Sequence, residues 1–253
     1  MLQCRYCERF YSKLAKAHII PRSFYKVIRG SDKYSVEVKV KENYEKQKYW
    51  QSGIYDSSIV CQGCEKLFNA FDTHGYEVLS VALSQKKVCY DSDGQPCAYL
   101  MENVDYQKLK LFFLSMLWRA HASSLIFFSH VDLGSHEPIL RSYISSATAP
   151  PSDEYEIVLF HLINQPYPPG IFPPWKHKAD GVNVYKLYLP NVIAMVKVDK
   201  RPLPKLFNPI VLREIPPHHL VFLPYFDSSE MRYIEEMKSF LKLGIKAILR
   251  TVF

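Results

Sequence analysis

The 253-residue chain lacks any apolar run long enough to cross a bilayer. A membrane-spanning helix needs about 20 consecutive apolar residues, and the longest run here, Leu111 to Trp118, is interrupted by Ser115. The N-terminus has no basic segment followed by an apolar one, so we expect no secretory signal. These absences predict a cytoplasmic protein with no membrane partner.

The chain also lacks a strongly positive or negative net charge. The formal net charge is only +7, which permits attraction to phosphate without requiring it. Residues 1–76 carry 13 Lys and Arg against 8 Asp and Glu, so most of this excess lies in the first third of the chain. A hydrophobic content of 48% excludes wholesale disorder, and the length allows one domain or two.

Four of the six cysteines form two pairs with CxxC spacing. Cys4 pairs with Cys7, and Cys61 pairs with Cys64. Two such pairs can complete a closed four-sulfur zinc site, which has no open position for a substrate and is therefore structural. The alternative is two unrelated cysteine turns, one of them redox-active. The zinc site is the preferred interpretation, because two such pairs arise together by chance far less often than one. A bound zinc ion would also stabilise a region whose own core is thin.

The first two thirds of the chain contain an expected arm and an expected long helix. Within residues 33–48, Val36 and Val38 alternate with Glu37 and Lys39, which favours an exposed hairpin arm. Its lysines could meet a phosphate backbone or form a solvated charged face. Residues 77–149 are expected to be largely helical. Apolar residues at helical spacing predict an amphipathic helix over 105–124, capped by Asp105.

Residues 150–253 have a different pattern, rich in proline. Residues 154–163 and 182–198 read as strands, and Pro190-Asn191 breaks the second one in the manner of a hairpin. Proline clusters between the strands predict extended connectors. Residues 229–243 are expected to form a final helix.

A histidine and two acidic residues lie at informative positions around the cysteine pairs. His18 begins the run His-Ile-Ile-Pro, Asp56 stands five residues before Cys61, and Glu65 immediately follows Cys64. Over residues 4–72 this arrangement resembles the HNH family of nucleases, also called His-Me finger or ββα-metal nucleases. The family pattern has a zinc knuckle, a histidine in a His-Ile-x-Pro setting, an asparagine before the second knuckle, and metal ligands on the helix that follows.

The resemblance implies a role for each of these residues. His18 takes the place of the general base, and Asp56 takes the place of the asparagine that orients it. Glu65 falls at the offset of the helix-borne metal ligand, and Asn69, one helical turn later, is an expected second ligand. The catalytic cation is then Mg²⁺ or Mn²⁺.

One position departs from the family pattern. Many HNH nucleases have a metal ligand just before the histidine, where this chain has Ala17. The cation would then depend on the two helix residues, on water and on the substrate phosphate, which Mg²⁺ tolerates. Lys16 and Arg22 are expected to bind the phosphate of the substrate.

The resemblance predicts an endonuclease that hydrolyses phosphodiester bonds, in DNA more than in RNA. It further implies an effector of a bacterial anti-phage or mobile-element system, acting with a protein partner or as a homo-oligomer. Two alternatives stay open: a non-catalytic zinc module that binds nucleic acid or protein, and a nuclease subunit that is silent until its partner arrives.

The expected fold class is α+β. A zinc-clamped ββα unit should lead, followed by a helical middle and a mixed C-terminal region. We expect an HNH-like domain over residues 1–80, and a second domain over 81–253 that binds substrate, partner or a second copy.

Overall fold

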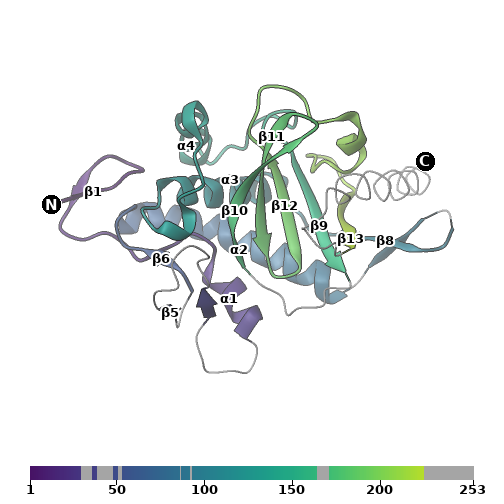
Figure 1. The fold of residues 1–253 in the computed structure, drawn as a ribbon, viewed down its shortest axis with the longest axis horizontal. Helices are drawn as coiled ribbons and strands as arrows, with labels where there is room; N and C mark the ends of the chain where they lie inside the picture. Colours follow the sequence, from purple (N-terminus) through teal and green to yellow (C-terminus); the bar gives the residue numbers. More distant parts are fainter. Residues whose placement is uncertain are drawn as a thin grey trace.

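The computed structural model describes residues 1–29, 36–38, 48–50, 53–85, 87–91, 93–163 and 171–224. It shows a mixed α/β fold in which several helices pack beside one large sheet (Figure 1). The N-terminal segments lie to one side of that sheet. No helix within the described part of the chain has the length and apolar character needed to span a bilayer.

The sheet has seven strands in the order β10-β11-β12-β9-β13-β8-β7. All neighbouring strands are antiparallel except β13 and β9, which are parallel. Every residue of the interior strand β12 is buried, which is the pattern of a strand covered on both faces. The strands are β7 (Val88–Tyr90), β8 (Pro96–Met101), β9 (Ile157–Ile163), β10 (Phe172–Ala179), β11 (Val182–Leu189), β12 (Val192–Lys197) and β13 (His218–Pro224).

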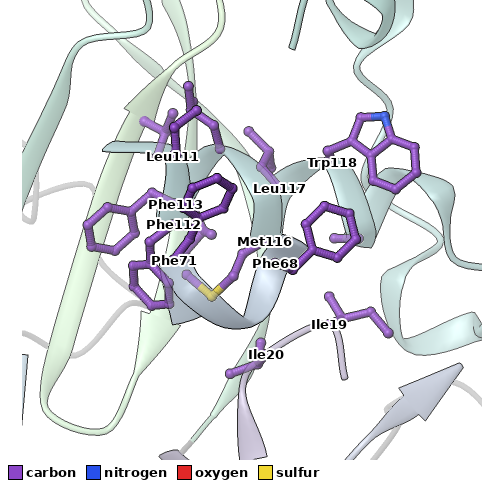
Figure 2. Close-up of a cluster of buried hydrophobic side chains, with 14 of the residues drawn as sticks. Ile19, Ile20, Phe68, Phe71, Leu111, Phe112, Phe113, Met116, Leu117 and Trp118 are labelled. Carbon is purple, nitrogen blue, oxygen red and sulfur yellow. The ribbon is translucent and has the colours of Figure 1, made fainter. Parts of the chain in front are cut away.

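The helix α3 (Tyr106–Ala122) forms the centre of the main hydrophobic core. Asp105 caps it by accepting a hydrogen bond from the backbone N–H of Lys108, as its sequence predicts. Fourteen of its 17 residues are buried, because it packs against the sheet and against two other helices, α2 (Gln62–Gln85) and α4 (Glu137–Ser145). Figure 2 shows Phe68 and Phe71 of α2 in this core together with Ile19 and Ile20.

The N-terminal segment consists of short elements around the start of α2. The strands β1 (Leu2–Gln3) and β2 (Phe10–Tyr11) form one hairpin, and β3 (Ala17–His18) pairs with β6 (Tyr55–Asp56). The helix α1 (Arg22–Arg29) follows β3. In the expected arm, β4 (Val36–Val38) and β5 (Lys48–Trp50) pair antiparallel, and the residues between them lie outside the described part.

Several predictions about elements are confirmed, one is incomplete and one is wrong. The helix at 105–124 and the hairpin broken at Pro190-Asn191 are present. The middle is not only helical, because β7 and β8 lie between α2 and α3 and join the large sheet. Pro173 and Pro174 do not form a connector but lie in the edge strand β10, whose pairing with β11 is irregular between Phe172 and Trp175 and therefore tolerates residues without an N–H. The predicted helix at 229–243 lies outside the described residues.

The main core crosses the expected boundary at residue 80. That residue lies within α2, and one buried cluster contains residues from both sides of it, including Cys4 near the start and Leu220 in β13. The two proposed parts therefore share their packing, and whether they divide in function stays a prediction.

We predict that Gly75→Ala lowers the free energy of unfolding. A Cβ at this position in α2 would lie 2.4 Å from the ring of Phe112 in α3. Overpacking of this kind costs about 1–3 kcal/mol, which exceeds the gain of about 1 kcal/mol in helix propensity. Urea denaturation measures the change.

Gly63→Ala on the same helix is the matched control, because its Cβ would meet only the Cys61 Sγ atom at an ordinary 3.8 Å. An increase in stability for both variants would contradict the close approach of α2 to α3.

Candidate metal centre and catalytic site

The four cysteines of the two CxxC pairs converge on one point. Cys4 and Cys7 lie in the turn between β1 and β2, and Cys61 and Cys64 lie at the start of α2. Their sulfur atoms are all within 4.8 Å of one another. The Cys4–Cys64, Cys7–Cys61 and Cys61–Cys64 sulfur distances are 3.8, 3.9 and 3.5 Å. Sulfurs bonded at about 2.3 Å to a tetrahedral zinc lie about 3.8 Å apart, so the four cysteines fit a structural zinc ion.

Neighbouring donors support this cluster. The backbone N–H groups of Cys7 and Cys61 donate to the Cys4 sulfur at 3.5 and 3.3 Å. The Tyr11 hydroxyl lies 3.7 Å from the Cys7 sulfur, a contact that the sequence analysis missed. Burial raises the pKa of the Cys64 thiol. A bound cation would offset the cost of placing several thiolates in this position.

We predict one zinc per chain, lost in Cys7→Ser together with a lower melting temperature. A structural zinc stabilises the folded state, so its loss destabilises the contact between the N-terminal hairpin and α2. Metal analysis and thermal unfolding measure both effects. Cys89→Ser is the control, because Cys89 is a free thiol outside the cluster. Full zinc content in Cys7→Ser would contradict the assignment.

His18 lies on β3, in the short antiparallel pair that leads into α2. Its residue partner across the pair is Tyr55 of β6, and the two rings lie 5.8 Å apart. Lys16 is exposed, and its Nζ atom lies 5.3 Å from the centre of the Tyr55 ring. The three side chains therefore form a basic and aromatic surface. Tyr55 was missed from the sequence, since its place opposite His18 depends on the strand register.

Glu65 in the first turn of α2 contacts the backbone of His18. Its carboxylate accepts a hydrogen bond from the His18 N–H, while Oε2 is buried and has no hydrogen-bond partner among the described residues. Burial raises the pKa of Glu65 above its ordinary value, although the positive charge of Arg119 opposes this. An oxygen without a partner fits the expected role of cation ligand.

Asp56 is buried and is held by serines at both carboxylate oxygens. Oδ1 accepts from the backbone N–H and the hydroxyl of Ser58, at 2.8 and 2.6 Å. Oδ2 accepts from the Ser123 hydroxyl at 2.8 Å and from the Ser124 backbone N–H at 3.0 Å. These contacts fasten β6 to the residues that follow α3. The expected role of Asp56 in orienting His18 stays a prediction.

The serine contacts determine how Asp56 titrates. Burial would raise the pKa of this carboxyl, but the hydrogen bonds from Ser58, Ser123 and Ser124 outweigh it and hold the pKa below its ordinary value. A lowered folded-state pKa adds stability that is fully present above about pH 4, where the unfolded carboxyl is also ionised. That stability is lost as the pH falls through the folded-state pKa.

We predict that Asp56→Asn lowers the free energy of unfolding at pH 7 by about 1–3 kcal/mol, because an amide nitrogen cannot accept the serine hydrogen bonds. The variant should also lose less stability than the wild type between pH 4 and pH 2. Denaturation at several pH values measures both effects. Asp93→Asn, at an exposed turn position, is the control. A parallel pH dependence in the wild type and Asp56→Asn would contradict the account.

The other predicted site residues, Arg22 and Asn69, lie on the surface of the protein. Arg22 is exposed at the first residue of α1, and Asn69 is exposed on α2. Ala17 is fully buried, so the position that carries a metal ligand in many HNH nucleases belongs here to the core.

Two residues that the sequence analysis did not assign complete the surroundings of His18. Asp72 on α2 and Arg119 on α3 form an ion pair at 2.6 Å, and Arg119 also donates to the His18 carbonyl at 2.6 Å. The signal available in the sequence was an arginine directly after the apolar run from Leu111 to Trp118. A second signal was the spacing of seven residues between Glu65 and Asp72, which places them on one helix face.

Comparisons with protein-family models, with curated proteins and with solved structures give no match for this chain. No relative therefore assigns a family or an activity. The side chains around His18 and the four-cysteine cluster are the features of the molecule from which a function can be inferred.

Proposed function

We propose that this chain is a metal-dependent endonuclease of the HNH type. The observation that carries the proposal is the approach of Glu65 to His18. The pair β3–β6 leads into α2, and the carboxylate of Glu65 on that helix accepts the His18 backbone N–H. A histidine on one strand and an acidic residue on the following helix, beside a four-cysteine cluster, is the arrangement expected of a zinc-clamped ββα-metal unit.

The chemistry of phosphodiester hydrolysis matches these residue types. The reaction needs a base that deprotonates the attacking water and positive charge beside the scissile phosphate. An imidazole changes charge near neutral pH, so His18 can take the proton. Lys16 and Arg22 are both exposed and can contact the phosphate. A divalent cation, Mg²⁺ or Mn²⁺, would stabilise charge on the phosphate and the leaving oxygen when bound.

The cation would have few ligands from the protein. Glu65 offers an oxygen without a hydrogen-bond partner among the described residues, and the exposed Asn69 lies one turn further along α2. The buried Ala17 offers none. Magnesium ions commonly retain several waters and take further oxygens from substrate phosphates, so this sparse set is compatible with a site completed by substrate.

The proposed substrate is nucleic acid, with DNA favoured over RNA. The excess of basic residues in the first 76 positions supports attraction to a phosphate backbone. The aromatic ring of Tyr55 next to Lys16 adds a surface on which a base can stack. Action as an effector in bacterial defence, with a protein partner or as a homo-oligomer, is the wider setting that this proposal implies.

We predict that zinc-loaded protein nicks supercoiled plasmid in the presence of Mg²⁺ or Mn²⁺. His18→Ala should lower the rate by at least about 100-fold, as expected for loss of a general base. Glu65→Gln should lower the rate of nicking and weaken its stimulation by the added cation. His130→Ala is the control, since His130 is exposed and lies against Trp175 of β10. Equal nicking by the wild type and His18→Ala would dismiss the assigned site.

A second candidate function is a non-catalytic zinc module that binds nucleic acid. It is favoured by the buried methyl group of Ala17 and by the engagement of Asp72 with Arg119, which together leave few ligands for a cation. Salt-sensitive binding in a gel-shift assay without nicking by any divalent metal would favour this function. Nicking only after a partner is added would identify a silent nuclease subunit.

A further inference from the structure

We propose that Arg119 of α3 is a positioning residue that fixes the backbone of His18 against the face of α2 that carries Glu65. Arg119 lies far outside residues 4–72, to which the HNH resemblance is confined. The inference rests on the proposed function, because it concerns the same histidine.

Every N–H group of the Arg119 guanidinium has an acceptor. Within α3, Nε donates to the Ser115 carbonyl at 3.2 Å and Nη2 to the Ser115 hydroxyl at 3.4 Å. Toward α2, Nη2 and Nη1 donate to the two carboxylate oxygens of Asp72 at 2.6 and 2.9 Å. Toward β3, Nη1 donates to the His18 carbonyl at 2.6 Å. Since the five donors sit in a rigid planar fork, a rotation of the group would break several of these bonds together.

The His18 backbone is held by two helices. Its N–H donates to Glu65 on α2, and its carbonyl accepts from Arg119 on α3. The strand that carries it has only two residues, and its paired strand β6 is equally short. Pairing of this length cannot fix a backbone by itself. The two helix contacts therefore hold the backbone from which the imidazole extends.

Through its bonds to Asp72, Arg119 connects α2 to β3, the strand that carries His18. Asp72 stands two turns after Glu65 on α2, so both acidic side chains share one face of that helix. Phe68 lies between them along the chain, and the Arg119 guanidinium carbon is 5.0 Å from the centre of its ring. The guanidinium thus holds β3, which carries His18, against the face of α2 that carries Glu65.

The burial of the Arg119–Asp72 ion pair supports a positioning role. The Arg119 side chain is 0% exposed and that of Asp72 is 14% exposed. A buried ion pair often adds little stability compared with apolar side chains of similar volume, but it can fix one geometry among several. Positioning the His18 backbone is a role that apolar replacements could not fulfil.

The experiment compares three variants of the full-length, zinc-loaded protein. Arg119→Lys keeps a positive charge but loses the planar fork. The double variant Arg119→Met with Asp72→Leu replaces the ion pair by apolar volume and removes the donor to the His18 carbonyl. Arg141→Lys is the control, because Arg141 also joins separate segments through Glu8 and the Tyr6 carbonyl without touching His18.

Four measurements are made on each variant: zinc content, amide hydrogen exchange at residue 18, NMR titration of the His18 ring, and kcat and KM for plasmid nicking. In Arg119→Lys and in the double variant, zinc content should be unchanged. Exchange at residue 18 should accelerate by at least about tenfold through easier local opening. The His18 titration should shift, and kcat should fall by about 10- to 100-fold with little change in KM, as for a misplaced catalytic group. Arg141→Lys should match the wild type.

The proposal would be overturned if the double variant had the same amide exchange at residue 18, the same His18 titration and the same kcat as the wild type. Arg119 would then have no role in positioning His18. If the double variant does not fold, Arg119→Lys decides by the same measurements. The exchange and titration results do not depend on cleavage. If the wild type does not cleave but these two signals change, the proposed function fails while the positioning of His18 by Arg119 stands.

Discussion

The geometry of the candidate site depends on polar groups at the C-terminal end of a buried helix, α3. The core fixes α3, because nearly all of its residues are buried between the sheet and the neighbouring helices. Near its C-terminus, Arg119 bonds to the His18 carbonyl on β3, and the following Ser123 bonds to Asp56 on β6. Two strands of two residues each would not hold their shape alone. They take it from a distant helix, whose Arg119 lies 101 residues after His18 in the chain.

The sulfur cluster and the Arg119 ion pair act on the same small unit with different chemistry. The sulfurs of Cys4 and Cys64 hold the first hairpin to the start of α2, and a bound zinc ion would close this contact. The guanidinium of Arg119 holds the next strand to a later turn of α2 through Asp72. Removing one partner of such a buried pair costs about 3–5 kcal/mol. The face of α2 between these two contacts is where Glu65 meets the His18 backbone.

Features determined by nearby residues could be predicted from the sequence. The CxxC spacings identified the four sulfurs that converge, apolar spacing identified α3 with its Asp105 cap, and the break at Pro190-Asn191 identified the β11–β12 hairpin. Features that depend on distant pairing could not be predicted. The strands β7 and β8 join a sheet through β13, more than a hundred residues later, so no local pattern specifies their place. The same limit concealed the Asp72–Arg119 pair and the serines around Asp56, because separations of 47 and 67 residues leave no periodic signal.

The central claim is that a divalent cation binds next to the His18 ring through Glu65. Paramagnetic broadening by Mn²⁺ tests this most directly in zinc-loaded protein, because broadening falls steeply with distance from the ion. We expect Mn²⁺ at substoichiometric concentration to broaden the His18 ring signal of the wild type, while the ring signal of the exposed His130 stays sharp. In Glu65→Gln the His18 signal should stay sharp as well. Equal broadening of His18 in both proteins, or no broadening in either, would contradict the account.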